Sequence, residues 1–227
     1  MRRDVEKRLI DAGVVVKGDL IVLTYGDQMP ALPVLNYDNS RLLPESYTGT
    51  LVTSKEIEGL ELNAGRFTAE SRKSAEGRDS GGLKSINVLG GSYQFTEQFK
   101  GALYASDVED VLKKQYINLN YTLPIAESQA LNFDFNGYRT SSQGQELAGN
   151  VDNKIWSLAA AYSIGAHKFT LAHQRSTGDS GYYYGVDGGG TIFLANSVQY
   201  SDFNQRDERS WQGRYDLNMA SYGVPDR

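Results

Sequence analysis

Apolar and polar side chains alternate along several stretches of the chain, as in LNFDFNGYR at 131–139. There Leu131, Phe133 and Phe135 are separated by Asn and Asp residues. Successive side chains of a β-strand point to opposite faces of its sheet, so the pattern predicts strands with one apolar and one polar face. The alternation recurs at 117–123, 155–164, 168–174 and 210–223. We expect about ten strands and an all-β, antiparallel fold.

The segments between the predicted strands alternate in length. Short connections occupy 54–59, 95–99, 124–129 and 163–168, and longer ones occupy 27–47, 68–85, 141–153 and 176–191. The short stretch at 106–110 is an exception, because it falls where a long connection is due. This alternation places the long loops at one end of an up-and-down meander, which is the layout of barrels in outer membranes.

An apolar strand face can lie against a protein core or against lipid, and alternation alone does not distinguish the two. In a soluble β-sandwich the apolar face packs against a second sheet. Two features besides the loop lengths favour a membrane barrel with a wet interior. The polar positions are often Asn, Gln, Ser or Thr, and the apolar faces end in aromatic residues, as at a membrane interface. These aromatic residues are Tyr121, Trp156, Tyr162, Trp211 and Tyr215.

The composition narrows the range of functions. A net charge of −5 without a clustered basic run argues against nucleic acid as a partner. The chain has no cysteine, which excludes a disulfide framework and thiolate metal sites. No stretch approaches the roughly 18 apolar residues of a spanning helix. Residues 1–18 lack the apolar core of a secretory signal, so we expect no signal peptide in this chain.

Signatures of an enzyme are weak. Nothing in the sequence places His167 or His173 beside a serine and an aspartate, as nucleophilic catalysis requires. The glycine-rich stretch 185–191 lacks the Lys-Ser/Thr pair of a phosphate-binding loop. The spacing of acidic residues and histidines matches neither a calcium loop nor a zinc site. We therefore expect a protein that is not an enzyme and uses no cofactor.

Several segments resemble the OprD family of substrate-specific outer-membrane porins. MPALPVLNYDNSRLLP at 29–44 is similar to the family's pore-constricting loop, and EIEGLELNAGRFT at 56–68 to the turn and strand that follow. The strongest similarity covers most of 121–225, including YTLPIAESQALNFDFNGYRT and SWQGRYDLNMASYGVP. The loops at 68–85 and 176–190 look shorter than those of the family.

The resemblance implies a transmembrane β-barrel in the outer membrane of a Gram-negative cell. Family members have a signal peptide and about 18 strands, and this chain resembles only their middle. We therefore expect residues 14–227 to form an incomplete barrel with its constricting loops, and residues 1–13 to be an unmatched N-terminal segment. The chain is then an internal fragment of a parent porin. A non-functional truncated product and a soluble all-β binding module are the alternatives.

The resemblance also implies which residues carry transport. Arg41 would belong to a ladder of basic side chains that hold a carboxylate, with Lys17 as a further member. Alternatively, Arg41 pairs with an acid in its own loop. Across the pore, Asp202 would attract the ammonium or guanidinium end of a substrate. The other polar residues expected at the constriction are Ser197, Tyr200, Asp38 and Tyr183.

These residues imply passive diffusion of small carboxylate-bearing nutrients such as basic amino acids. The expected partners are that substrate and outer-membrane lipid, with a homotrimer as an assembly of the full-length parent. Conduction requires weak holding at several points, so no deep pocket is expected. Arg139, Arg175 and Arg214 lie near strand ends or on the polar face, and we interpret them as solvated charges.

A sheet of about ten strands that does not close has two open edges. Each edge exposes several unpaired N–H and C=O groups to lipid, and the total cost, roughly tens of kcal/mol, exceeds the stability of a domain. We predict that the purified chain, added alone to a planar bilayer, gives no discrete single-channel steps. Reproducible steps that a substrate blocks would contradict this prediction.

Overall fold

The computed structural model describes residues 21–40, 43–185 and 192–223. Within these ranges ten strands form one antiparallel sheet, and β2 (Ala31–Leu32) and β3 (Leu35–Asn36) form a separate hairpin. No helix in this part of the chain is long and apolar enough to cross a membrane. The strands of the main sheet are β1 (Ile21–Gln28), β4 (Ser46–Ser54), β5 (Leu60–Ser71), β6 (Ile86–Gln94), β7 (Phe99–Val108), β8 (Leu112–Ala126), β9 (Gln129–Ser142), β10 (Asp152–Ile164), β11 (His167–Gly178) and β12 (Arg209–Leu217).

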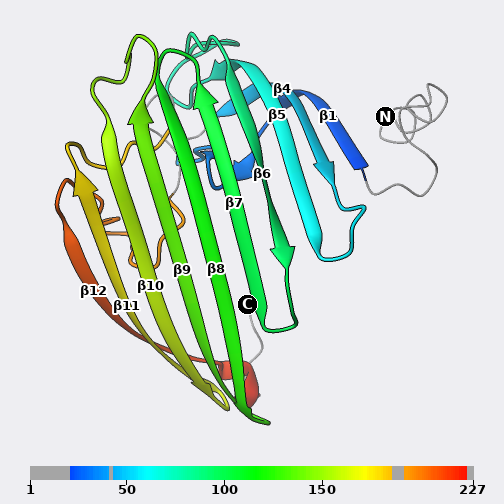
Figure 1. Ribbon diagram of the computed structural model, residues 1–227, viewed down its shortest axis with the longest axis vertical. Coiled ribbons are helices and arrows are strands. Elements are labelled where there is room, and N and C mark those ends of the chain that lie inside the picture. Colours follow the sequence, from blue (N-terminus) through cyan, green and yellow to red (C-terminus); the bar gives the residue numbers. More distant parts are fainter. Residues whose placement is uncertain (1–20, 41–42, 186–191, 224–227) are drawn as a thin grey trace.

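The strands of the main sheet lie side by side in their order along the chain, each antiparallel to the next (Figure 1). Short connections at one end of the sheet occupy 55–59, 95–98, 127–128 and 165–166. Connections at the other end occupy 29–45, 72–85, 109–111, 143–151 and 179–208. The predicted meander of about ten strands is confirmed, and so is the exceptional short connection between β7 and β8.

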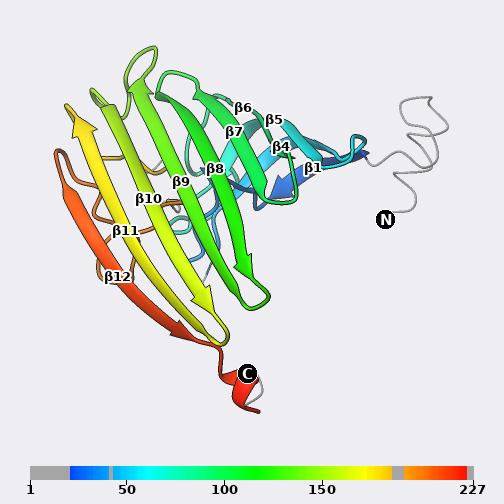
Figure 2. The same ribbon diagram turned by 60° about the horizontal axis from the view of Figure 1, so that its bottom comes forward.

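The two faces of the sheet carry different side chains. On one face Asn118 of β8 lies opposite Asn136 of β9. On the other, Phe133 and Trp211 are 39% and 70% exposed. Figures 1 and 2 show the sheet curving around its own long connections, so we call the first face concave and the second convex. A β-sandwich would cover the convex face with a second sheet. None of the described residues does so, and this part of the chain therefore does not form the sandwich weighed as an alternative.

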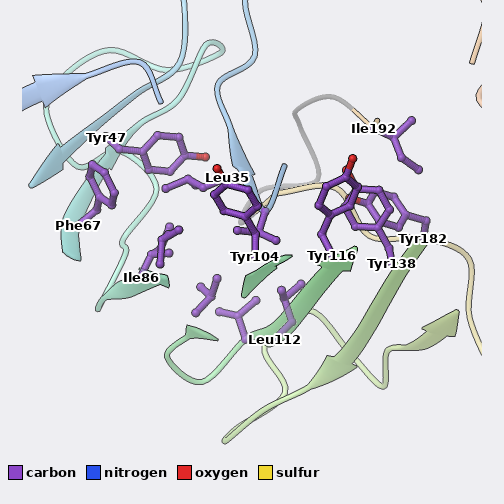
Figure 3. Packing of buried hydrophobic residues seen from close by; sticks show 14 of the residues in the cluster. Leu35, Tyr47, Phe67, Ile86, Tyr104, Leu112, Tyr116, Tyr138, Tyr182 and Ile192 are labelled. Atoms are coloured by element: carbon purple, nitrogen blue, oxygen red, sulfur yellow. The ribbon is translucent and has the colours of Figure 1, made fainter. Parts of the chain in front are cut away.

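The buried apolar core lies between the concave face and the connections at the long-loop end, chiefly 29–45 and 179–208 (Figure 3). Tyr104, Tyr116 and Tyr138 project into it from three neighbouring strands. Leu35 from β3 and Tyr182 from 179–208 pack onto them. The ring centroids of Tyr116 and Tyr138 are 4.7 Å apart, and those of Tyr138 and Tyr182 are 5.2 Å apart. Burial of each large side chain contributes about 1.5–3 kcal/mol, so this packing holds the connections against the wall.

Gly90 on β6 makes room for the ring of Tyr104, its direct partner on β7. A Cβ at Gly90 would lie 2.3 Å from a ring carbon of Tyr104 and 2.6 Å from the carbonyl oxygen of Leu103. The ring cannot simply move aside, because its hydroxyl accepts a hydrogen bond from Asn63 Nδ2 at 3.1 Å. We predict that Gly90→Val lowers the free energy of unfolding by about 1–3 kcal/mol, measured by guanidinium unfolding in detergent micelles.

The matched control for this prediction is Gly213→Val on β12. A Cβ at Gly213 has no heavy atom within 4 Å, so the same substitution should change the unfolding free energy by less than about 0.5 kcal/mol. Equal losses of stability at Gly90 and Gly213 would show that the contact with Tyr104 is not the cause.

Candidate functional site

Two connections fold back onto the concave face at the long-loop end of the sheet. One is 29–45, which contains the β2–β3 hairpin, and the other is 179–208 (Figure 2). Their backbone N–H and C=O groups lose water where they pack against the wall, so these groups need protein partners. Side chains of the concave face supply such partners and thereby fix the connections in place.

Gln174 provides the most extensive of these links. β11 directs its side chain to the concave face, where it is fully buried. Its Nε2 donates to the carbonyl oxygens of Asp202 at 2.6 Å and Phe203 at 2.9 Å. Its Oε1 accepts from the backbone N–H of Asn196 at 3.4 Å. One wall side chain therefore fixes both ends of the segment 196–203, which contains three residues expected at the constriction.

Four further wall side chains bond to the backbone of the two connections. The hydroxyl of Tyr138 accepts from Phe193 N at 3.2 Å, Ser157 Oγ accepts from Ala195 N at 3.0 Å, Asn153 Nδ2 donates to Ser180 O at 3.0 Å, and Ser106 Oγ donates to Val34 O at 3.1 Å. Each bond is worth about 0.5–1.5 kcal/mol net, and an unmade one would leave a buried group unsatisfied. Together they give the connections a defined path across the concave face.

Lys114 of β8 brings a positive charge beneath the connection 179–208. Its side chain is 2% exposed. Its ammonium donates to the carbonyl oxygen of Tyr184 and lies 4.6 Å from the centre of the Tyr182 ring. No carboxylate in the described ranges forms an ion pair with it. A buried cation needs compensation, and here the carbonyl dipole and the face of the ring supply it.

Asp202 lies near the end of the segment that Gln174 holds. Ser197 Oγ donates to its Oδ1, and the hydroxyl of Tyr184 donates to its Oδ2. Burial raises the pKa of the Tyr184 hydroxyl, so this group stays protonated and remains a donor at neutral pH. The two hydroxyls orient the carboxylate while leaving it half-buried.

The structure brings three of the predicted residues together. Ser197 is hydrogen-bonded to Asp202, and Tyr200 lies in the turn between them, closed by a bridge from Val198 to Ser201. The side chain of Tyr200 is 92% exposed. Tyr183 immediately precedes Tyr184, whose carbonyl oxygen accepts from Lys114. The side chain of Tyr183 is half-buried against the apolar core.

The remaining predicted residues belong to the N-terminal part of the chain. Asp38 lies in the connection 29–45, where its carboxylate accepts from Ser40 N at 2.7 Å and pairs with Lys73. The positive charge of Lys73 therefore partly neutralises the Asp38 carboxylate. Lys17 and Arg41 lie outside the described residues.

A strip of amide side chains on the concave face of β8 and β9 was not predicted as part of the site. Asn118 Nδ2 donates to Asp134 Oδ1 and Asn136 Oδ1, both at 2.9 Å, and Asn120 Nδ2 donates to the same Asp134 oxygen at 2.9 Å. Asn132 extends the strip by donating to Asn120 Oδ1 at 3.0 Å. The alternation in the sequence gives the polar face, but only the strand register shows that these residues bond across the strands.

The concave wall, with two connections folded over it, has a counterpart among known families. Residues 10–226 match the family described as outer membrane porin, OprD family. The chain belongs to the OprD family. It is 46% identical over 228 residues to "Porin D" of Pseudomonas aeruginosa, across 93% of this chain and 51% of the relative. It is 29% identical to "Porin-like protein GalP" of Pseudomonas putida, across 89% of this chain and 51% of that relative. The chain thus spans about half the length of these curated relatives.

Solved structures of OprD-family proteins have the same architecture. A crystal structure of Pseudomonas aeruginosa OprD gives a TM-score of 0.76 at 46% identity, covering 90% of this chain and 54% of that one. Pseudomonas aeruginosa OpdQ gives a TM-score of 0.80 at 32% identity, covering 92% and 60%. OprD-family proteins are outer-membrane channels and not enzymes, and the resemblance found in the sequence is confirmed. In such a barrel the convex face meets lipid and the concave face lines the lumen.

We predict that Gln174→Leu releases the segment 196–203 from the lumen wall. The substitution leaves the carbonyl groups of Asp202 and Phe203 without their donor, at a cost of about 1–3 kcal/mol for each buried group. Trypsin cleavage after Arg206, whose side chain is 60% exposed in the same connection, should become at least about fivefold faster in detergent.

Gln115→Leu provides the matched control, because Gln115 is exposed on the convex face of β8. It should leave the cleavage rate after Arg206 the same as in the unsubstituted 227-residue chain. An unchanged rate in the Gln174 variant would mean that the segment is held by its other contacts, and that the role given to Gln174 is wrong.

Proposed function

We propose that this chain supplies the constriction of an outer-membrane channel for passive, selective diffusion of small carboxylate-bearing nutrients such as basic amino acids. The observation that supports the proposal most directly is the carboxylate of Asp202, oriented by Ser197 and Tyr184 on a segment that folds back over the concave face. A fixed charge at a narrow point of a wet lumen is the usual basis of selectivity in such channels.

In this proposal the two ends of the substrate meet opposite charges. Asp202 attracts the ammonium or guanidinium end, and its two hydroxyl partners keep the carboxylate in one orientation. Arg41 and Lys17, predicted from the family resemblance, hold the substrate's carboxylate from the other side. A guanidinium suits this role because it remains charged and binds a carboxylate through two parallel hydrogen bonds. Solutes that satisfy only one wall would be disfavoured.

The amide strip gives the substrate further weak contacts along the wall. Asn118, Asn120 and Asn132 present both donors and acceptors, so they can replace part of the hydration shell of either end of a zwitterion. Each contact is weak, which allows the substrate to leave as well as to enter. The strip therefore supports diffusion rather than storage.

This function requires a closed barrel. In the part of the chain that the structure describes, β1 and β12 are edges without a partner strand. Unpaired backbone groups in lipid are costly, so we place the channel in a barrel in which further strands cover both edges. The second hypothesis, a product that does not conduct by itself, rests on these same two edges. A homotrimer of the parent remains a prediction.

A chimeric barrel tests the role of Asp202. The chain replaces the matching half of Porin D from Pseudomonas aeruginosa, and the chimera is reconstituted in planar bilayers. We predict that Asp202→Asn lowers the preference for cations and reduces the frequency of lysine-induced current blockages by about threefold or more, because it removes a fixed negative charge close to the passing ammonium.

Glu97→Gln is the charge-matched control, because Glu97 is exposed in the short connection 95–98, far along the strands from the constriction. It should leave both readings unchanged. If the chimera conducts and Asp202→Asn gives the same cation preference and the same blockage frequency as the parent, the proposed role of Asp202 is wrong.

A further inference from the structure

A row of basic side chains runs along the convex face near the long-loop ends of β8 to β12. All are exposed. Each lies an even number of residues from the convex-face residues of its own strand, so it points away from the concave face. We call this row the basic band. Its members are Lys113, Arg139, Lys154, Arg175 and Arg209.

The basic band contains two like-charge pairs in direct cross-strand register. Arg139 lies opposite Lys154, and Arg175 lies opposite Arg209. Like charges in directly opposite positions destabilise a sheet. Arg139 is 3.8 Å from Asp152, but Lys154, Arg175 and Arg209 form no ion pair with any described residue. An anion placed between these cations would remove the repulsion.

The position of the basic band relative to the membrane follows from the aromatic side chains beside it. Phe135, Trp156, His173 and Trp211 form a continuous row on the convex face, with centroid distances of 6.3 Å, 5.5 Å and 4.3 Å between successive rings. Aromatic rows of this kind lie at the boundary between hydrocarbon and water. The basic band is on the long-loop side of this row, which in an outer-membrane barrel faces the outer leaflet.

The basic band follows the tilt of the strands. Arg175 lies two positions nearer the short turns than Thr177, which is the direct partner of Lys154. Tilted strands of a barrel need such a shift for their residues to remain at one height in the membrane. The two-position shift between Lys154 and Arg175 is in the direction that keeps the band at a similar height as the strands tilt. A charged side chain on the lipid face is tolerated best at this interfacial level.

An apolar depression adjoins the basic band on the same face. It has a volume of about 710 Å³, and its lining includes Leu103, Ile117, Phe135 and Gly137. Arg139 and Lys154 also line it. The depression therefore places an apolar surface directly beside two cations. This is the arrangement that a lipid with an anionic headgroup would fill.

We propose that this face binds a phosphate-bearing lipid of the outer leaflet, with an acyl chain in the depression and phosphate among the cations of the basic band. A guanidinium binds phosphate through two parallel hydrogen bonds, and an ammonium adds a point charge. The ligand is a membrane lipid instead of free phosphate, because free phosphate has no part that would occupy the apolar depression. This binding is separate from transport, since it uses the face opposite to the lumen.

The test follows the binding of lipid A to the 227-residue chain in detergent micelles. Trp156 and Trp211 are the chain's two tryptophans and both lie beside the basic band, so their emission reports its occupancy. We expect a saturable change with phosphorylated lipid A. The triple variant Lys154→Gln, Arg175→Gln, Arg209→Gln should weaken binding by about tenfold or more. Dephosphorylated lipid A should bind the parent chain as weakly as phosphorylated lipid A binds the variant.

The matched control removes three cations that lie near the short connections, at the opposite end of the strands from the basic band. Lys55→Gln, Lys100→Gln, Lys168→Gln changes the net charge equally, and it should leave binding unchanged. The charge-conserving variant Lys154→Arg, Arg175→Lys, Arg209→Lys should also retain binding. Equal weakening in both Gln variants, or equal binding of dephosphorylated lipid A by the parent chain, would overturn the proposal.

Two further arms separate the lipid from other anions and from loss of folding. Inorganic phosphate at millimolar concentration should neither change the emission nor compete, and full competition would overturn the choice of a lipid. Gly137→Leu fills the depression without changing charge, and its Cβ makes only ordinary contacts of 3.4–3.5 Å. It should weaken lipid A binding while keeping the circular dichroism of the parent sheet. Unchanged binding would show that the depression is not used.

Discussion

Every backbone N–H and C=O group in this molecule needs a partner wherever water is absent, and this single requirement accounts for both the wall and the connections. In lipid an unpaired group costs several kcal/mol, so the strands must pair along their whole length. The meander from β1 to β12 satisfies this requirement strand by strand. The same requirement applies inside the wall, where the folded-back connections have no strand partners. There Gln174, Ser157 and Asn153 take the place of a neighbouring strand.

The alternation of side chains then lets one strand serve two solvents. On β9, Phe133 and its convex-face neighbours meet hydrocarbon, while Asn132 and Asn136 line the lumen one residue away. At the long-loop end the concave face changes character and becomes apolar, with Tyr138 packed on Tyr182. Because this part of the concave face is apolar, the connection 179–208 can pack against it. The concave face is thus polar along the amide strip and apolar beneath the connections.

The sequence was sufficient to predict the elements whose pattern is local. Strand alternation and connection lengths follow from neighbouring residues, so the meander and the short exception at 109–111 could be predicted. The grouping of Ser197, Tyr200 and Asp202 was predicted from the family resemblance alone, and the structure places the bonded pair Ser197 and Asp202 on either side of the turn that carries Tyr200. The link from Gln174 to Asp202 spans 28 residues, and nothing local marks it. The alternation of side chains along β11 places Gln174 on the concave face. Its hydrogen-bond partner, however, depends on the path of the connection.

The alternation of faces along a strand also decides the environment of each charged side chain, as two consecutive lysines of β8 show. Lys113 points to the convex face, where its side chain is 55% exposed and lies 3.6 Å from Asp107. Lys114 points to the concave face and is buried beneath the connection that carries Tyr184. A shift of one residue in strand register would exchange the faces to which these two lysines point. The register that pairs the backbone therefore also assigns one lysine to the convex face and the other to the support of the connection 179–208.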